Sequence, residues 1–243
     1  MSEETGNRVL ITGATDGIGL LMAQRFSKLG WEVLATGRQP LAKPEKVFGD
    51  ASVTYIRADQ SYPRQAAQSI DRVMTELDWK TCDLVVLNAG IGWTGNPVDE
   101  QASDISEQVM VNLSAPVQIS HILAPRLLAG NGHLVFIGST AHKGAKSFAT
   151  YAATKGALKG FARSLREEWR DRVRVQVIHP GPVKTAMHSK AGLKLGLSRL
   201  MFTKPRRAAN AIMSAILRGE EEVTVSHLSS AVSGWWAPRG LRK

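Results

Sequence analysis

Residues 8–19 read Arg8-Val9-Leu10-Ile11-Thr12-Gly13-Ala14-Thr15-Asp16-Gly17-Ile18-Gly19. A short apolar run leads into a turn with three glycines, and residues 17–29 then carry apolar side chains at helical spacing. Glycines at a strand-to-helix turn permit a tight bend and let the backbone approach a phosphate, at which the helix N-terminus points. Because the turn follows the first strand and opens a βαβ unit, it predicts a dinucleotide site in an α/β fold.

The rest of the chain continues this alternation of β-branched runs and helical stretches. The continuous apolar run Leu84-Val85-Val86-Leu87 suits a central strand buried on both faces. The pattern predicts a Rossmann-like, doubly wound α/β fold, with a seven-stranded, mainly parallel sheet, helices on both faces and one domain over residues 1–243. The expected strands are 8–12, 31–36, 53–58, 83–88, 133–139, 172–179 and 223–226, and the clearest helices are 17–29, 65–77, 104–128 and 149–170.

The composition is that of an ordinary globular chain, with 243 residues, 43% hydrophobic residues and a formal net charge of +10. A single cysteine, Cys82, excludes a disulfide framework and a cysteine-built metal site. The six histidines show no metal-ligand spacing, so no metal is expected and redox chemistry would depend on a bound cofactor. The polar N-terminus and the lack of any run of roughly 18 apolar residues predict a cytoplasmic protein.

The positive charge is concentrated in the second half of the chain. Residues 1–142 carry a net charge of −4 and residues 143–243 carry +14, with no acidic residue between Asp171 and Glu220. This half could bind an anionic partner or form a solvated surface. The basic residues are not interleaved with aromatics, so nucleic acid is not an expected partner. The acidic clusters at 167–168 and 220–222 are interpreted as solvated faces.

Ordered motifs continue beyond the glycine turn. They fall at the ends of expected strands and in the helices that follow: Asn88-Ala89-Gly90, Asn112, Ser139, Tyr151 with Lys155, and Pro180-Gly181-Pro182-Val183-Lys184-Thr185. Together with the Thr-Gly-x-x-x-Gly-x-Gly form of the first turn, residues 8–187 resemble the short-chain dehydrogenase/reductase family. The resemblance covers the Asn-Ala-Gly, Tyr-x-x-x-Lys and Pro-Gly-x-Val-x-Thr motifs in the family order.

Tyr151 and Lys155 lie four residues apart on an expected helix, so their side chains project from the same face and can share one cleft. Carbonyl reduction needs a hydride donor on one side and a proton donor on the other. A free tyrosine titrates near pH 10, and an adjacent ammonium would lower the pKa of Tyr151 toward neutrality. The resemblance implies that Tyr151 is the acid in reduction and the base in oxidation, and that Lys155 also holds the cofactor ribose. It further implies that Ser139 binds the carbonyl oxygen and that Asn112 anchors a water in the proton chain.

The end of the second strand bears on the choice of nicotinamide cofactor. NAD-using relatives typically carry an acid there, whereas this chain has Gly37 followed by Arg38, which favours a 2′-phosphate and hence NADP(H) over NAD(H). Asp16 departs from the pattern of many NADP-using relatives, which have a basic residue at that position. Asp59 matches the acid that contacts adenine, or is an ordinary turn aspartate. The resemblance implies cofactor contacts at Gly13, Thr15, Asp16, Gly17, Ile18, Gly37, Arg38, Asp59, Asn88, Ala89, Gly90, Tyr151, Lys155, Pro180, Gly181, Val183 and Thr185.

Residues 186–205 correspond to the substrate lid of the family. Their leucines, methionines and phenylalanine suggest an apolar substrate, while their bases could receive a carboxylate, a phosphopantetheine or an acidic carrier protein; a core-packing helix is the alternative. Candidate substrate contacts are Trp93, His142, Phe148 and Met187. The tail, residues 227–243, lacks the glycine-rich ending that helps to build a tetramer in many relatives. Its Trp235-Trp236 pair is expected to pack against the lid or a second subunit rather than a membrane surface.

The function expected from these residues is NADPH-dependent, reversible reduction of a mid-sized apolar ketone or aldehyde by a homodimer or homotetramer. An alternative within the same class is a reductase of 3-oxoacyl groups on a carrier protein or coenzyme A, which the basic lid favours. A non-catalytic NADP(H)-binding sensor or scaffold is the alternative from another class. The presence of the complete set Asn112, Ser139, Tyr151 and Lys155 argues against that last hypothesis.

Overall fold

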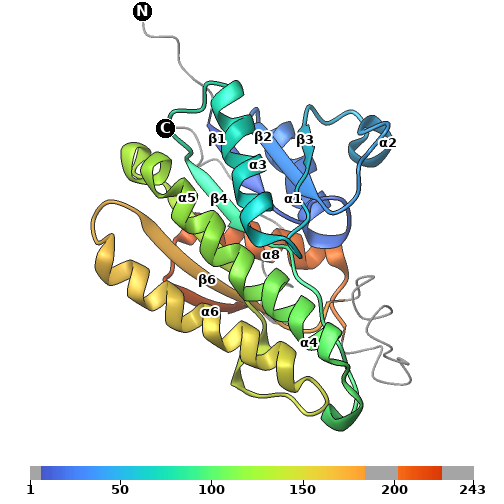
Figure 1. Ribbon diagram of the computed structural model, residues 1–243. Coiled ribbons are helices and arrows are strands. Elements are labelled where there is room, and N and C mark those ends of the chain that lie inside the picture. Colours follow the sequence, from blue (N-terminus) through green and yellow to red (C-terminus); the bar gives the residue numbers. More distant parts are fainter. Residues whose placement is uncertain (1–6, 184–201, 226–243) are drawn as a thin grey trace, which may run out of the picture.

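The computed structural model describes residues 7–183 and 202–225, in which seven strands form one sheet (Figure 1). The strand order is β3-β2-β1-β4-β5-β6-β7, and every pairing is parallel. The predicted doubly wound α/β fold is therefore confirmed, and the order reverses between β1 and β4, where such sheets open a crevice for ligands. The strands are β1 Arg8–Ile11, β2 Glu32–Gly37, β3 Thr54–Arg57, β4 Leu84–Leu87, β5 His133–Ile137, β6 Arg174–Pro180 and β7 Glu222–Val225.

The helices match the four predicted segments closely, except in the middle of the third. In the described part of the chain, two helices lie outside those segments: the single turn α2, and α8, which begins at the last residue of the expected lid. The α-helices are α1 Gly17–Lys28, α2 Glu45–Phe48, α3 Pro63–Glu76, α4 Ala102–Val109, α5 Ala115–Gly130, α6 Ala149–Glu168 and α8 Pro205–Arg218; the 3-10 turns are η1 Pro97–Asp99 and η3 Thr140–Lys143, and η2 Met110–Ser114 is a π-helix.

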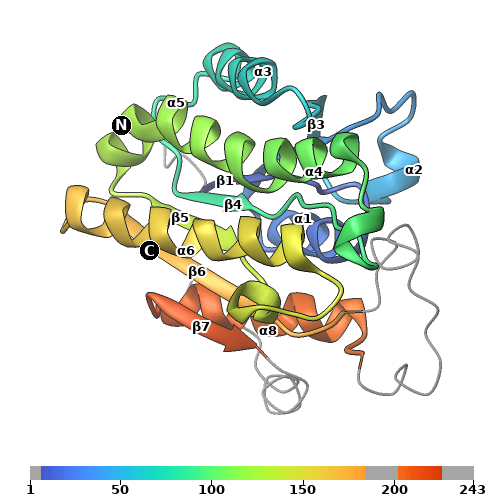
Figure 2. The same cartoon turned by 60° about the horizontal axis from the view of Figure 1, so that its bottom comes forward.

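Helices cover both faces of the sheet, which lies between them as a middle layer (Figure 2). On one face, Val9 and Ile11 of β1 pack in a core that includes Met22 of α1 and Ile212 of α8. On the other face, Leu10 packs in a second core with side chains from α3, α5 and α6. Successive side chains of β1 point to opposite faces of the sheet, and each face is covered by an apolar core. Every residue of the run must therefore be apolar, which is why the run is continuous in the sequence.

The prediction of one regular α-helix over residues 104–128 is wrong at its centre. The π-helix η2 separates α4 from α5 and contains Asn112, whose side chain is fully buried. Pro116, at the start of α5, has no N–H with which to donate to the Asn112 carbonyl four residues earlier, so the regular hydrogen-bond ladder cannot continue there. Apolar periodicity alone does not reveal such a break.

Several expectations fall on residues that the structure does not describe. Thr185, Met187, most of the expected lid (186–201) and the tail (227–243) lie outside the described ranges. At the described end of the lid segment, the Thr203 N–H donates to the Pro182 carbonyl at 2.9 Å, and Thr203 forms an isolated parallel bridge with Val183. None of the helices in the described part of the chain combines the length and the apolar character needed to cross a bilayer.

Candidate functional site

The glycine turn after β1 is packed too closely to accept a side chain. Gly13 has φ +63°, and a Cβ atom built there would stand 2.8 Å from the Cα atom of Ala89. A Cβ atom on Gly19 would stand 2.3 Å from the Gly13 carbonyl oxygen. These contacts explain the glycines of the motif, because only a bare backbone lets α1 begin so close to the end of β4.

A clamp of polar side chains joins the ends of β1 and β4. The Thr12 hydroxyl accepts hydrogen bonds from the N–H groups of Asn88 at 3.0 Å and Ala89 at 3.1 Å. In return, the Asn88 amide donates to the carbonyls of Thr12 at 2.9 Å and Gly13 at 3.1 Å. The Asn-Ala-Gly motif therefore fixes the shape of the glycine turn, and Thr12 is a supporting residue that the sequence analysis did not assign.

A cavity of about 560 Å³ opens at the carboxyl ends of the strands, beside the reversal between β1 and β4. Every predicted cofactor-binding residue within the described ranges lines it: Gly13, Thr15, Asp16, Gly17, Ile18, Gly37, Arg38, Asp59, Asn88, Ala89, Gly90, Tyr151, Lys155, Pro180, Gly181 and Val183. Ser139 and Phe148 line the same cavity. Residues from six strand ends thus meet in one place, as expected for a parallel sheet.

One part of the cavity carries charged side chains on both walls. The Arg38 guanidinium, after β2, lies 3.7 Å from the carboxylate of Glu107 on α4. The Asp16 carboxylate caps α1 by accepting from the Gly17 N–H at 2.6 Å. Asp59 lines the cavity and also caps a local turn, accepting from the Ser61 N–H at 3.1 Å and the Ser61 hydroxyl at 2.8 Å. Both interpretations of Asp59 therefore fit its position.

Tyr151 and Lys155 occupy the opposite part of the cavity and are both buried, with 8% and 3% of their surface exposed. The Lys155 Nζ donates to the carbonyl of Ile137 at 2.9 Å and lies 5.9 Å from the centre of the Tyr151 ring. Burial lowers the pKa of Lys155 from 10.5 to about 8. The two side chains share one face of α6, as the four-residue spacing predicted.

The expected fall in the pKa of Tyr151 is wrong for this structure. Burial raises the pKa of Tyr151 above its usual value, and only a hydrogen bond with the Ser139 side chain acts in the opposite direction. The Lys155 Nζ lies 5.9 Å from the ring centre and donates to a main-chain carbonyl, and it is not among the groups that lower the pKa of Tyr151. Tyr151 is therefore a protonated donor across the neutral pH range.

Ser139 stands at the end of β5 and begins the turn η3, where its hydroxyl also accepts from the Ala141 N–H at 3.2 Å. The extended backbone of Ser139 and this cap fix the side chain next to Tyr151. The predicted trio Ser139, Tyr151 and Lys155 is thus brought together at one wall of the cavity.

Asn112 does not line the cavity but holds one of its walls. Its Oδ1 accepts from the Ile91 N–H at 2.8 Å, and its Nδ2 donates to the Ile91 carbonyl at 2.8 Å and to the Thr154 hydroxyl at 3.2 Å. These bonds tie the segment after β4 to the helix that carries Tyr151 and Lys155. The side chain is fully engaged in this clamp, so the water-anchoring role expected for Asn112 stays a prediction.

The candidate substrate contacts divide into two groups. Phe148 lines the cavity, with its ring centre 6.2 Å from that of Tyr151. Trp93 and His142 are not among the described residues that line it; the Trp93 ring packs over Gly95, and His142 stacks on His179 behind Ser139.

The sequence analysis missed Glu107 and Val111, both of which line the cavity. Their four-residue spacing on one helical segment was the available signal.

The donor set of the cavity suits a phosphate-bearing dinucleotide. The N-terminus of α1 and the Arg38 guanidinium offer donors to anions, and the Lys155 ammonium stands in the opposite part of the cavity. The half-buried hydroxyl of Ser139 and the buried hydroxyl of Tyr151 can bind and protonate an oxygen atom close to that ammonium. The arrangement can therefore hold a dinucleotide and carry out proton transfer at its far end.

Comparison with known proteins gives matches over most of the chain. The family described as short chain dehydrogenase matches residues 7–195. The cyclic-di-GMP-binding biofilm dispersal mediator protein of Escherichia coli is 31% identical over 242 residues, which cover 96% of this chain and 98% of that protein.

Solved structures resemble the fold closely. A short-chain dehydrogenase from Burkholderia cenocepacia in complex with NADP has 27% sequence identity and a TM-score of 0.77, covering 91% of this chain and 97% of that one. A short-chain dehydrogenase from Sphingobium yanoikuyae in complex with NADPH has a TM-score of 0.78 and 22% identity, covering 90% of this chain and 87% of that one. At 22% identity, the second likeness concerns the fold alone.

Proposed function

Because the chain belongs to the short-chain dehydrogenase family, we propose that it is an NADPH-dependent oxidoreductase that reversibly reduces the carbonyl of a mid-sized apolar ketone or aldehyde. The single observation that carries this proposal is the convergence of Ser139, Tyr151 and Lys155 on a cavity that also holds the glycine turn and Arg38. The buried proton donor and the anion-binding elements stand in different parts of that cavity, as a dinucleotide-dependent reduction requires.

Arg38 and the glycine turn support the assignment of NADP(H). Arg38 lines the cavity after β2, next to Gly37 at a position that offers no acid to a ribose. A guanidinium presents a planar fork of donors that matches a phosphate. The NADP bound by the Burkholderia cenocepacia relative is consistent with this assignment.

The proposed chemistry assigns separate tasks to the side chains of this wall. When bound, the nicotinamide supplies the hydride that reaches the carbonyl carbon. Tyr151 gives its hydroxyl proton to the carbonyl oxygen as the negative charge develops there, and Ser139 donates a hydrogen bond that orients this oxygen. The phenolate left on Tyr151 regains a proton from solvent, while Lys155 would hold the cofactor ribose. In alcohol oxidation, Tyr151 accepts the proton instead.

Substitution of the proton donor tests the proposal. Tyr151→Phe is expected to lower the rate of NADPH oxidation with a ketone at least about 100-fold, while the affinity for NADPH stays within about twofold. Tyr62→Phe is the matched control, because Tyr62 is 59% exposed and does not line the cavity. Reduction by Tyr151→Phe at the parental rate would show that another group donates the proton.

The substrate class is proposed from the wall around the proton donor. Phe148, Ile91 and Pro182 line the cavity together with Tyr151, so an apolar group beside the carbonyl would be well packed. A panel of aliphatic, aryl and thioester-linked ketones separates this proposal from reduction of 3-oxoacyl carriers. Preference for a carrier-linked substrate that weakens as salt rises would support the alternative, since salt screens attraction between exposed charges.

A second candidate function is ligand binding without turnover. It is favoured by the 31% identity, over nearly the whole chain, to a protein named as cyclic-di-GMP-binding. Calorimetric titration with cyclic-di-GMP, in the presence and absence of NADPH, tests this candidate directly. Binding without turnover across the ketone panel would favour a sensor, whereas turnover without cyclic-di-GMP binding would favour the reductase.

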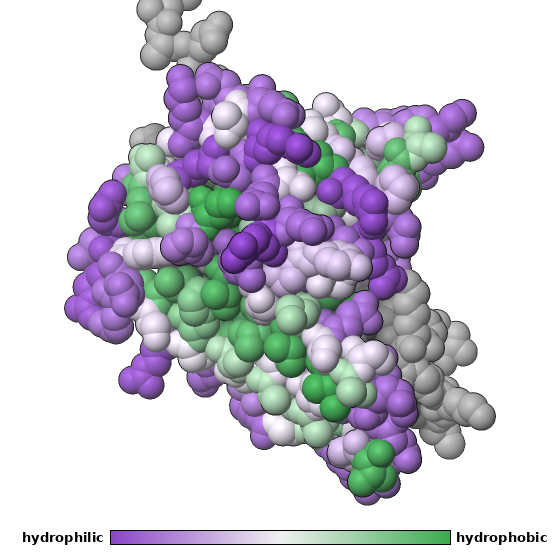
Figure 3. Space-filling model, viewed as in Figure 1, coloured by the Kyte–Doolittle hydropathy of each residue, from purple (hydrophilic) through white to green (hydrophobic). Residues whose placement is uncertain are grey.

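We also propose that the protein forms a homodimer or homotetramer through α5 and α6. An apolar band runs over these helices (Figure 3), and a groove of about 510 Å³ there is lined by Val117, Ile122, Phe161, Leu165 and Trp169 among others. A patch of this kind on a globular protein is typical of an interaction surface. Phe161→Asp is expected to shift the mass measured by light scattering toward the monomer, and an unchanged mass would contradict this surface.

A further inference from the structure

Two histidines and a glutamate from three different elements meet behind Ser139, outside the set of residues that line the dinucleotide cavity. His142 belongs to η3, His179 to β6 and Glu222 to β7, and one potential ligand atom from each lies within 4.8 Å of the others. The two imidazole rings are stacked, with their centres 3.9 Å apart. The three residues are far apart in the sequence, so spacing along the chain gave no sign of them.

The hydrogen-bond geometry determines which ring nitrogens carry protons. The Ser139 carbonyl oxygen lies 2.7 Å from the Nδ1 atom of His142 and 3.2 Å from the Nδ1 atom of His179, and it also accepts from the main-chain N–H of His142 at 3.1 Å. A carbonyl oxygen can only accept, so both Nδ1 atoms must be donors. A neutral imidazole that is protonated on Nδ1 presents a bare lone pair at Nε2.

The Nε2 lone pair of His179 is buried and lacks a donor. His179 is completely buried, and its Nε2 has no hydrogen-bond partner among the described residues. Oε1 of Glu222 lies 3.3 Å from this nitrogen, and a carboxylate also only accepts. Two acceptors therefore face each other with nothing positive between them. Burial and the neighbouring His142 lower the pKa of His179 to about 4, so a bound cation rather than a proton would resolve this contact at neutral pH.

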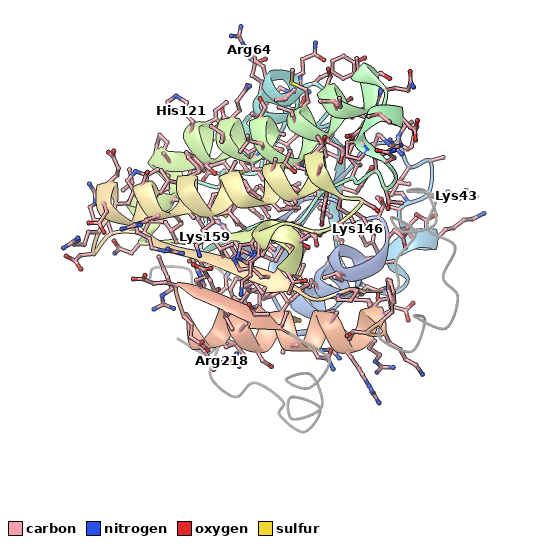
Figure 4. All side chains as sticks on the ribbon, turned by 90° about the horizontal axis from the view of Figure 1, so that it is seen from below. Lys43, Arg64, His121, Lys146, Lys159 and Arg218 are labelled. Atoms are coloured by element: carbon pink, nitrogen blue, oxygen red, sulfur yellow. The ribbon has the colours of Figure 1, made fainter. Side chains whose placement is uncertain are left out.

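Within the described part of the chain, Lys159 is the only lysine or arginine that forms an ion pair with Glu222. Its Nζ lies 2.9 Å from Glu222 Oε1, and residues 220–222 are exposed, as expected. Figure 4 shows Lys159 on the side of α6 that faces β6 and β7. Its side chain is about half exposed, and it reaches the carboxylate rather than the His179 nitrogen. A long exposed side chain of this kind can move aside for another cation.

We propose that His142, His179 and Glu222 bind a divalent transition-metal ion of the zinc type. Two neutral imidazoles and one carboxylate are a common ligand set for zinc, with one position left for water. Histidines that bind a metal through one ring nitrogen usually donate a hydrogen bond from the other, which fixes the orientation of the ring. The Nδ1–H bonds from His142 and His179 to the Ser139 carbonyl would have this role. Tetrahedral zinc needs ligand atoms about 3.3 Å apart, which half-buried His142 and exposed Glu222 can approach by side-chain rotation. The ion would join η3, directly after Ser139, to the last two strands.

Titration of the untagged full-length protein with Zn²⁺, after removal of metals by a chelator, tests the site. One equivalent is expected to bind to the parent, and His142→Ala is expected to weaken this binding at least about tenfold. Lys159→Met should tighten it, because it removes the competing ammonium. Co²⁺ should give the absorption bands of a tetrahedral complex in the parent and lose them in His142→Ala.

Two control measurements separate binding at this cluster from binding elsewhere on the protein and from loss of the fold. His121→Ala, on the outer face of α5 (Figure 4), should leave Zn²⁺ binding unchanged. Because His142 is only half buried, its truncation should preserve the circular dichroism spectrum, and Lys159→Met provides a second, independent variant. Failure of the parent to bind Zn²⁺, or equal affinity in the parent and His142→Ala, would overturn the proposal. Neither result depends on the proposed reductase activity.

Discussion

Arg38 and Glu107 form an ion pair between two walls of the dinucleotide cavity, with the guanidinium Nη1 3.7 Å from the carboxylate Oε1. Their side chains are 51% and 41% exposed, so the pair contributes little to stability. Its importance lies in ligand binding, because the proposed 2′-phosphate needs the donors of Arg38. Glu107 occupies one of these donors and carries the same sign of charge as the phosphate, so we expect it to limit the affinity for NADPH.

Glu107→Gln is expected to tighten NADPH binding. Removal of one exposed ion pair and of the repulsion should lower the dissociation constant about two- to fivefold, with a smaller effect on NADH, which lacks the 2′-phosphate. Fluorescence titration of both cofactors measures the change. Glu76→Gln, which alters an exposed acid of α3 outside the cavity, is the control. An equal change for NADPH and NADH would mean that Glu107 does not act through the phosphate.

Arg38→Ala is expected to remove the preference for NADPH. Charge-assisted hydrogen bonds contribute about 1.5–3 kcal/mol, so the affinity for NADPH should fall roughly 10- to 100-fold while that for NADH changes little. The ratio of kcat/KM values for the two cofactors reports the same effect. Arg72→Ala, on the exposed face of α3, should leave the ratio unchanged. If the unmodified protein preferred NADH, the proposal that Arg38 binds the 2′-phosphate of NADPH would be contradicted.

Asn112→Ala is expected to destabilise the protein by about 2–4 kcal/mol, because it leaves the N–H and carbonyl of Ile91 without their buried partners. Turnover should fall as well, since the clamp holds the segment after β4 against the helix of Tyr151. Urea unfolding measures the first effect. Gln101→Ala, an exposed amide at the start of α4, should change the free energy of unfolding by less than about 0.5 kcal/mol. An equal free energy of unfolding for Asn112→Ala and Gln101→Ala would show that the hydrogen bonds from Asn112 to Ile91 do not stabilise the fold.

The buried ammonium of Lys155 predicts a pH dependence of stability without cofactor. The folded protein releases this proton near pH 8, the lowered pKa of Lys155, whereas the unfolded chain keeps it to about pH 10.5. The unfolded state thus binds more protons in this window, and the free energy of unfolding rises with pH.

Relative to Lys155→Met, the parent should gain about 3 kcal/mol between pH 7 and pH 10.5. Urea unfolding at several pH values, carried out on both proteins, isolates this contribution from other groups that titrate in alkali. Parallel curves for the two proteins would show that Lys155 is not desolvated in the folded state.

The elements of the fold could be predicted from local patterns. β-branched runs and helical periodicity gave the seven strands and the main helices within about two residues, because these patterns depend on neighbours in the chain. The glycine turn and the shared face of Tyr151 and Lys155 are local in the same way. The π-helix at Asn112 was missed because its cause is a missing donor at Pro116 together with contacts to Ile91.

Tertiary structure alone decided what each site residue touches. The parallel strand order brings the carboxyl ends of six strands to one cavity, and it sets Arg38 opposite Glu107. It also places His142 against His179 and separates both from the cavity where His142 was expected. Sequence therefore determined which elements form and which residues could do chemistry. Packing determined their partners, because contacts across the sheet join residues that no local period relates.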